Sequence, residues 1–365
     1  MRKRSRAKQS PEYTPSMSNL FRLPKGKKRI EVHSLDFDGC FGPAFKGFEK
    51  YKSMAEYNEE FVQYLFFKHK NSDNVELKFM VGSSRQSAVS DLRAMVQQDD
   101  KGENIFSGSC FVEIETFVSQ IKEYFNESKV DVSLDRFLTT DIFHERAFDS
   151  TFLQAQRENG NYLFGIYRDE IQKLENIVPD LYRQASNICA YLYNYNKAHK
   201  ILFDSGKFTL LLTQMHKIAS ENADADIDFH FYEDRDDILI PLYLIFNLHS
   251  ELLPANLVFH PHLYITGKSC LHPYLAGPIK GNGVIDYEYK NTAIALRKIA
   301  LDSTHPSHEK SAFVVDNLAD RFIVAKKLEE GVTELISTPL LLEFIEARKQ
   351  RLFLEAINYD TNHAC

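Results

Sequence analysis

A chain of 365 residues with 44% hydrophobic and 26% charged residues is long enough to form a large core, as one big or two modest domains. Its five cysteines lack CxxC or Cys/His spacing, which argues against a disulfide framework and a zinc site built on such a motif. Because no apolar run reaches about 18 residues and none follows the basic N-terminus, we expect a soluble protein of a reducing compartment, without a transmembrane helix or signal peptide.

The net charge of −7 is distributed unevenly along the chain. Residues 1–29 carry ten basic residues and one acidic residue, a charge of +9 that leaves about −16 for the remainder. Because this segment is rich in Ser and Pro and lacks periodicity, we predict a flexible basic tail over residues 1–28. Such a tail could contact an anionic membrane, nucleic acid or a protein such as a transport receptor, or it could serve solubility alone.

Strands and helices are expected to alternate along the rest of the chain. Residues 30–35 alternate apolar with polar side chains, as a half-buried strand does, and lead to Asp36 and Gly39. Further strands are predicted at 77–81, 132–142, 226–239 and 255–266. Helices are predicted at 56–70, from the end of the strand at 77–81 to residue 98, and at 110–126 and 204–223. Residues 143–200 are expected to be mainly helical, and helices are expected from about 288 to the end. This alternation favours an α/β fold with a parallel sheet and crossover helices.

In a parallel sheet, ligands bind beyond the carboxyl ends of the strands. Polar residues follow several of the predicted strands at these ends. Two acidic clusters, hydroxyls and a lysine are found there: Asp36 and Asp38, Ser83 and Ser84, Lys207, and Glu233, Asp234, Asp236 and Asp237. Converging on one edge, these groups favour metal-assisted phosphoryl transfer.

Two other interpretations of the first cluster fit less well. A calcium loop beginning at Asp36 needs an oxygen ligand, a glycine and a carboxylate where this chain has Cys40, Phe41 and Gly47. A cysteine phosphatase using Cys40 needs an arginine six residues later, and that position is Lys46. An Asp-rich turn without a catalytic role is common, so Asp36 and Asp38 indicate a phosphoryl-transfer site only together with the serine, lysine and second acidic cluster.

Several residues keep an ordinary structural alternative. Ser83 could cap a following helix, Lys207 could be a solvated residue with Lys197 or Lys200 entering the site instead, and Arg85 is expected on a helix surface rather than as a phosphate clamp. His260 and His262 share a strand face but lack a visible third ligand, which favours structural histidines over a metal site. The amphipathic stretch 337–358 is expected to cover the core or bind a partner.

The ordered set Asp36/Asp38, Ser83, Lys207 and Glu233-Asp234 resembles the signature of the haloacid dehalogenase-like (HAD) phosphatases over roughly residues 29–270. The phrases "VGSSRQS", "LLLTQMHKIAS" and "FYEDRDDIL" also resemble HAD-type domains of effectors injected by Legionella-like intracellular bacteria, some of which are phosphotyrosine phosphatases. The resemblance implies a Rossmann-like parallel sheet of the HAD type: a core at 29–287, a helical insertion at about 143–206 and a helical C-terminal extension at 288–365.

The resemblance also implies a mechanism. Asp36 would be the nucleophile that forms an aspartyl-phosphate, and Asp38 the general acid and then base. Ser83 would bind the phosphoryl oxygens and Lys207 would neutralise charge. Mg²⁺ would be held by Asp36, the carbonyl of Asp38 and Asp234. Asp237 would either bind the ion through a water molecule or replace Asp234 as a ligand. Glu233 could support these ligands without binding the ion itself.

The expected partner is a phosphorylated substrate, and a phosphoprotein is one candidate. The tail could contact an anionic membrane or a host protein, and nucleic acid is disfavoured as a partner. An effector of this kind would be secreted into the host cell cytoplasm. The alternative is a catalytically inactive interaction protein that keeps the HAD fold, although such a protein has no chemical need for both Asp36 and Asp38.

Overall fold

The computed structural model describes residues 27–42, 44–46, 53–86, 91, 96–98, 104–143, 152, 207–272 and 275–294. The predicted tail up to residue 26, nearly all of the predicted insertion and the C-terminal region beyond residue 294 lie outside these residues. So do the alternative lysines Lys197 and Lys200 and the amphipathic stretch 337–358. Lys27 and Lys28, assigned to the tail, are ion-paired to Asp226 and Glu76 at the edge of the fold.

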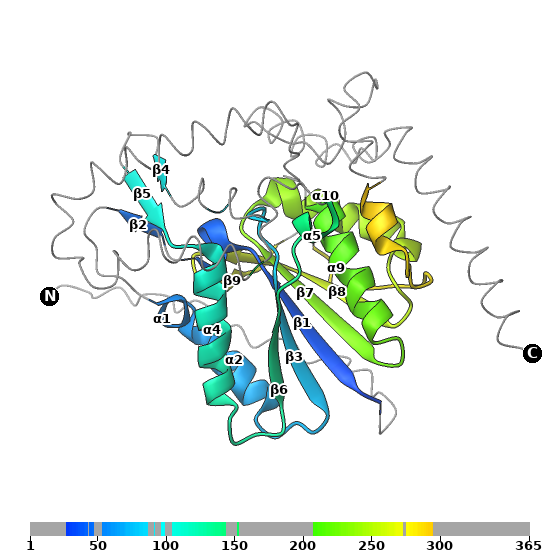
Figure 1. Cartoon of the computed structure of the whole chain (residues 1–365), viewed down its shortest axis with the longest axis horizontal. Helices are drawn as coiled ribbons and strands as arrows, with labels where there is room; N and C mark the ends of the chain where they lie inside the picture. Colours follow the sequence, from blue (N-terminus) through cyan, green and yellow to red (C-terminus); the bar gives the residue numbers. More distant parts are fainter. Residues whose placement is uncertain are drawn as a thin grey trace, which may run out of the picture.

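The fold is α/β, with a mostly parallel mixed sheet at its centre (Figure 1). The strands run in the order β10-β8-β7-β1-β3-β6, and β9 pairs with β8. Their bounds are β1 Arg29–Leu35, β3 Val75–Val81, β6 Asp131–Asp135, β7 Asp226–Glu233, β8 Leu257–Ile265, β9 Lys268–Cys270 and β10 Ile279–Lys280. The strands from β8 to β6 are parallel to one another, whereas β9 and β10 run antiparallel to β8.

Helices cover both faces of this sheet (Figure 1). One face carries α1 Met54–Tyr57, α2 Glu59–His69 and α4 Cys110–Tyr124, and the other carries α9 Phe208–Glu221 and α10 Asp236–Leu248. Short helices α5 Thr140–Phe143 and η4 Ser250–Leu252 lie in connections, and residues 289–294 are helical. Each face buries its own cluster of aromatic and aliphatic side chains, so the sheet is enclosed between two cores.

Strand β1 lies at the centre and is buried on both faces, so the prediction of a half-buried strand was wrong. Ile30 and Val32 contribute to the core beneath α9 and α10. The polar residues of the alternation, Glu31 and His33, are 0% exposed, because they lie on the face that α2 covers. The alternation therefore marks two differently filled buried faces rather than one buried and one solvated face.

Three other predicted elements differ from the structure. The strand expected over 132–142 ends early, because β6 spans Asp131–Asp135 and residues from Thr140 onward form α5. The helix expected to reach residue 98 is wrong at its end, because Val96–Gln98 forms β4, which pairs with β5 Asn104–Ser107. Together with β2 Ala44–Lys46, they make a small antiparallel sheet. The strand expected over 226–239 ends at Glu233, and residues from Asp236 onward begin α10, which the sequence analysis missed.

Candidate active site

Three neighbouring strands deliver polar residues to the same edge of the sheet. Because β1 lies between β3 and β7, with Leu35 in register with both Val81 and Tyr232, the residues that follow these three positions are neighbours. They are Asp36 after β1, Gly82 and Ser83 after β3, and Glu233 and Asp234 at the end of β7. The predicted convergence of Asp36, Ser83 and the acidic pair at one edge is thus what the register produces.

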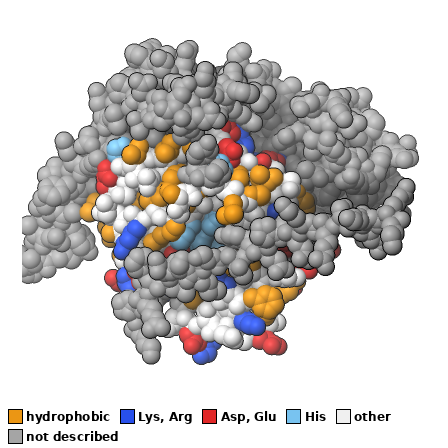
Figure 2. Space-filling view, turned by 180° about the vertical axis from the view of Figure 1, so that it is seen from behind, with side chains coloured by type: hydrophobic (Ala, Val, Ile, Leu, Met, Phe, Trp, Pro, Cys, Tyr) orange, Lys and Arg blue, Asp and Glu red, His pale blue; other side chains and the backbone are white. Residues whose placement is uncertain are grey.

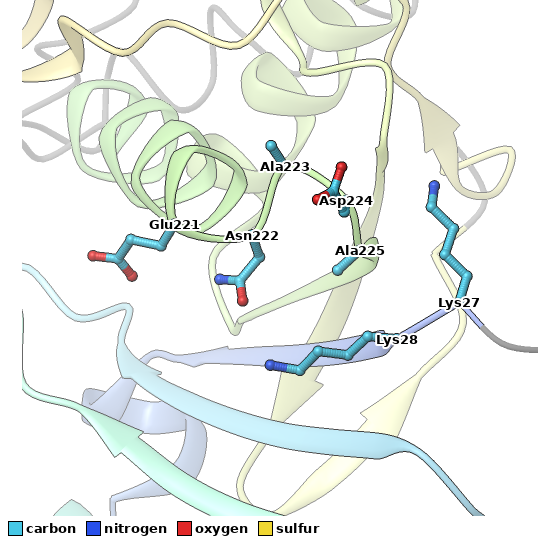
Figure 3. A pocket seen from close by; sticks show the side chains of 7 residues that line it. All are labelled: Lys27, Lys28, Glu221, Asn222, Ala223, Asp224 and Ala225. Atoms are coloured by element: carbon cyan, nitrogen blue, oxygen red, sulfur yellow. The ribbon is translucent and has the colours of Figure 1, made fainter.

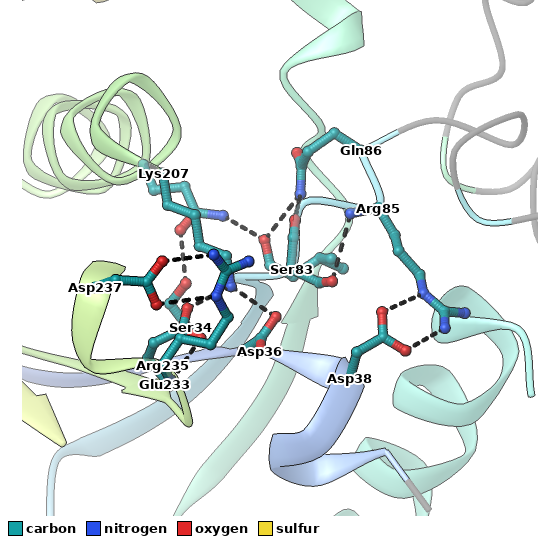
Figure 4. Close-up of polar contacts among 12 residues, drawn as sticks. Ser34, Asp36, Asp38, Ser83, Arg85, Gln86, Lys207, Glu233, Arg235 and Asp237 are labelled. Carbon is teal, nitrogen blue, oxygen red and sulfur yellow. Dashed lines mark hydrogen bonds and ion pairs between the residues drawn. The ribbon is translucent and has the colours of Figure 1, made fainter. Parts of the chain in front are cut away.

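Lys207 enters this edge from the start of α9. Its Nζ lies 2.7 Å from Oδ1 of Asp36 and 2.6 Å from Oε2 of Glu233, and its side chain is 3% exposed (Figure 4). The residue occupies the left-handed region at φ 55°, an unusual conformation for a lysine, directly before the helix. The side chain is therefore part of a buried ionic network rather than a solvated first-turn residue.

Three carboxylates surround this lysine. Asp36, Glu233 and Asp234 each offer an oxygen within 4.8 Å of the others, an arrangement that could hold a metal ion. Asp36 and Glu233 are 5% and 0% exposed, and Oδ1 of Asp234 is buried without a hydrogen-bond partner within the described residues. The carboxylate oxygens of Asp36, Glu233 and Asp234 are hard ligands of the kind that Mg²⁺ prefers, and one of them, Oδ1 of Asp234, is unpaired in the described part of the structure.

The protonation of these groups reflects burial opposed by Lys207. Burial raises the pKa of Asp36 to about 7, with the charge of Glu233 adding to the rise and Lys207 opposing it. The pKa of Glu233 is likewise raised to about 7 by burial. Burial and the charge of Asp36 raise the pKa of Asp234. The single lysine does not compensate three carboxylates, two of them buried and one partly buried, so an additional cation would stabilise their ionised forms.

Asp38 points to a different partner. Its carboxylate accepts hydrogen bonds from Nε of Arg85 at 2.8 Å and from Nη2 of the same guanidinium (Figure 4). Arg85 also donates to Asp91 at 3.1 Å and to the carbonyl of Gly108 at 3.0 Å. With 1% of its surface exposed, Arg85 is not the helix-surface residue that the sequence suggested. It ties the Asp38 side chain, which is 38% exposed, to the segment that precedes α4.

Ser83 lies between these two ionic groups in the view of Figure 4. It is 1% exposed, and its Oγ accepts a hydrogen bond from the backbone N–H of Arg85 at 3.4 Å. The Gln86 amide donates to the Ser83 carbonyl at 2.7 Å and so closes the turn that follows β3. The hydroxyl is thus held at the strand end by a tight local turn.

Asp237, proposed from the sequence as a metal ligand or a rival to Asp234, lies in the first turn of α10. Its carboxylate accepts hydrogen bonds from Arg235, at 3.2 Å from Nε and 2.6 Å from Nη2. The structure groups Glu233, rather than Asp237, with Asp36 and Asp234. The sequence placed Glu233 in the acidic pair that follows this strand and offered it as a support for the metal ligands. Its place as the last residue of β7 is what aligns it with Asp36.

Gly39 explains how the loop after β1 approaches the acidic group. The loop makes a tight turn over Phe37–Phe41, in which Gly39 adopts φ 73°. A Cβ atom at Gly39 would lie 2.3 Å from Oδ2 of Asp234, so a side chain would displace that carboxylate. The carbonyls of Gly39 and Cys40 accept hydrogen bonds from Thr266 and Gly267, which secure the loop to the β8–β9 turn.

A pocket of about 470 Å³ lies at the opposite end of the sheet, lined by residues before β1 and between α9 and β7 (Figure 3). Its lining combines Lys27 and Lys28 with Glu221 and Asp224. Because these residues precede the strands instead of following them, the pocket is separate from the carboxyl edge that holds Asp36.

Within the described residues, no helix combines the length and apolar character that a membrane span requires. Cys40, Cys110 and Cys270 are free thiols. The chain matches no family model, and neither the curated proteins nor the solved structures include a match to it.

Proposed function

We propose that this chain is a Mg²⁺-dependent phosphatase of the HAD-like type, which hydrolyses a phosphomonoester through an aspartyl-phosphate on Asp36. The observation that carries the proposal is the buried group at the end of β1, in which Asp36 contacts Lys207 beside Glu233 and Asp234. An aspartate held between a lysine and further carboxylates at the carboxyl edge of a parallel sheet suits phosphoryl transfer.

In the proposed reaction, a carboxylate oxygen of Asp36 attacks phosphorus, and the bond from phosphorus to the ester oxygen breaks. Asp38 gives a proton to the departing oxygen and later takes one from the water that hydrolyses the aspartyl-phosphate. Lys207 offsets the charge of Asp36 and the phosphoryl group, and Ser83 donates to a phosphoryl oxygen. Mg²⁺ bound by Asp36, Asp234 and the Asp38 carbonyl, with Glu233 or Asp237 nearby, would neutralise the substrate phosphate.

Arg85 gives the proposed acid a defined position. The two hydrogen bonds from its guanidinium fix the orientation of the Asp38 carboxylate, and the ring of Phe37 lies 4.8 Å from the guanidinium carbon. A bidentate arginine contact restricts a carboxylate more than a single lysine contact does. Proton transfer by Asp38 requires at least one of these hydrogen bonds to open when substrate enters.

The test is hydrolysis of a generic aryl phosphate by the full chain, with Mg²⁺ and with a chelator. We expect turnover only with the cation, and none from Asp36→Asn, which is nearly isosteric but cannot attack phosphorus. Asp226→Asn is the matched control, because Asp226 lies at the opposite end of β7 in a surface ion pair. Activity that survives chelation or Asp36→Asn would refute the scheme, and a folded wild type without activity on any phosphate ester would favour the inactive interaction protein.

The resemblance to phosphotyrosine phosphatase effectors supports a phosphoprotein as substrate and a role in a host cell cytoplasm. Comparison of phosphotyrosine, phosphoserine and phosphothreonine peptides tests the first point. The helical insertion and C-terminal extension belong to the same proposal, as does contact of the basic residues 1–28 with an anionic membrane or host protein. Deleting those residues should leave turnover of a small aryl phosphate intact and reduce binding to anionic vesicles or the protein substrate.

A further inference from the structure

The face of the sheet beneath α2 contains a group of histidines around one buried carboxylate. Glu31 and His33 come from β1, His230 is the register partner of His33 on β7, and His69 is the last residue of α2. These four side chains are between 0% and 8% exposed. Figure 2 shows histidine side chains gathered deep in the centre of one face of the molecule. A wholly buried polar group of this size needs compensating partners.

Most of the buried atoms that face one another here lack hydrogen bonds. Oε2 of Glu31, Nε2 of His33, both ring nitrogens of His69 and Nε2 of His230 have no hydrogen-bond partner in the described part of the chain. Lys68 donates to Oε1 of Glu31 at 2.7 Å, and its side chain is 26% exposed. A buried polar atom without a partner destabilises the fold, so several together indicate a ligand that pairs with them all.

The spacing of these atoms resembles the edge of a metal coordination shell. Nε2 of His33 lies 3.4 Å from Oε1 of Glu31, Nε2 of His230 lies 3.7 Å from the same oxygen, and Nε2 of His69 lies 3.1 Å from Oε2. The 3.1 Å contact is an ion pair only when the His69 ring is protonated. In a tetrahedral zinc site with ligands at about 2.0–2.1 Å, neighbouring ligand atoms are about 3.3 Å apart.

The outer side of two of these rings is already fixed. Nδ1 of His33 lies 3.0 Å from the hydroxyl of Tyr232, and Nδ1 of His230 lies 2.9 Å from Nε2 of His262. Histidines that bind metals characteristically use one ring nitrogen for the metal and the other for such a contact, which orients the ring. His262, disfavoured as a ligand from the sequence, therefore has the position of a supporting residue.

We propose that Glu31, His33, His69 and His230 form a binding site for a divalent transition-metal ion of the zinc class, separate from the acidic site at Asp36. Three imidazoles and one carboxylate are a ligand set that zinc accepts. The metal replaces Lys68 as the cation paired with Glu31, and Lys68 turns toward solvent. Among the described residues, the acidic group at Asp36 is the one whose ligand atoms all lie within 4.8 Å of one another. The imidazole nitrogens around Glu31 therefore move closer together when the metal binds.

The location of the site suits this role. The ligands join α2 to the two central strands β1 and β7. Enclosed in the core, the ion stabilises the fold and does not meet substrate, so this inference stands whether or not the proposed phosphatase activity does.

The experiment is zinc binding by the full chain in a large excess of Mg²⁺, which occupies the acidic site. Calorimetry is expected to show one tight equivalent of Zn²⁺ and a zinc-dependent rise in the thermal midpoint. X-ray absorption at the zinc edge should show nitrogen and oxygen ligands at about 2.0–2.1 Å. Substitution with Co²⁺ should give the strong visible absorption of a tetrahedral site. Absence of this equivalent, or six-coordinate oxygen ligation, would overturn the proposal.

Matched variants assign the site. Glu31→Gln and His69→Gln should each weaken zinc binding by roughly 100-fold or more, since even loss of supporting contacts costs 10–100-fold. His249→Gln, which changes a half-buried histidine paired with Glu251, should leave binding unchanged. Lys68→Met should tighten binding, because the competing cation is removed. Unchanged binding in both Glu31→Gln and His69→Gln would refute the site. If Glu31→Gln fails to fold, the other two variants still decide the question. The proposal then requires that His69→Gln weakens zinc binding and that Lys68→Met strengthens it.

Discussion

Replacement of Lys207 by methionine tests the ionic network most directly. The change keeps a long apolar side chain but removes the cation that lies 2.7 Å from Asp36 and 2.6 Å from Glu233. Removing one partner of a buried ion pair typically costs about 3–5 kcal/mol of unfolding free energy. Since a domain of this kind is stable by only about 5–15 kcal/mol, the loss at pH 8 should be a large part of the total.

The loss should shrink as the pH falls. Asp36 and Glu233 have pKa values near 7 even with Lys207 present, and removing the lysine raises both pKa values further. Each extra proton that the folded variant takes up recovers about 1.4 kcal/mol per pH unit relative to wild type. One extra proton therefore reduces the deficit by up to about 2.7 kcal/mol between pH 8 and pH 6.

The assay is urea unfolding of the chelated protein at pH 6, 7 and 8. Lys217→Met is the control, because Lys217 lies on the same helix and pairs with Asp135 at 2.6 Å and Glu221 at 2.8 Å. Its partners remain in contact with water, so we expect a loss of about 1 kcal/mol with little change over this pH range. Equal losses in the two variants, or a Lys207→Met deficit that does not depend on pH, would show that the network is not coupled as described.

Three further outcomes follow from the geometry. Gly39→Ala should lower the thermal midpoint and weaken Mg²⁺ binding measured by calorimetry, because the added Cβ would meet Asp234 at 2.3 Å and the positive φ costs about 1–2 kcal/mol. In the metal-free wild type, the pKa values of Asp36 and Glu233 rise from near 4 in the unfolded chain to about 7, so their contribution to unfolding free energy should fall as pH rises through 4–7. This fall should be smaller in Asp36→Asn or with Mg²⁺ present, and an identical pH profile would contradict it. Ser53→Ala should cost about 1 kcal/mol in chemical denaturation, because it removes the Oγ that accepts a hydrogen bond from the backbone N–H of Glu56 at the start of α1. Ser119→Ala on an exposed face should cost less.

The parts of the site that lie next to strand ends were accessible from the sequence. Asp36 and Ser83 directly follow apolar runs, and Lys207 directly precedes a helix with apolar spacing, so local patterns placed them at one edge. Arg85 was misplaced because its burial depends on Asp91 and Gly108, which local spacing does not bring to it. Such contacts between loops have no periodic signal in the sequence.

Other failures have equally specific causes. Helix α10 is apolar around most of its circumference and contains Pro241, so it lacks the one-sided pattern by which a surface helix is recognised. Glu31 and His33 gave the alternation of a solvated strand face, and nothing local indicated that α2 covers them. Polar residues on a buried face defeat an interpretation based on hydrophobicity alone, and they are the residues for which a second binding site is proposed.

The central position of β1 has a consequence for how the protein loses the Asp36 site. This strand is hydrogen-bonded to β3 on one side and β7 on the other, and Asp36 directly follows its last residue. Amide protons of β1 can exchange with solvent only when a flanking strand separates, which opens both cores at once. On heating, loss of the Asp36 site and the appearance of protease-sensitive chains should therefore proceed with the same half-life. A cell would contain either intact molecules with a complete Asp36 site or globally unfolded ones that its proteases remove.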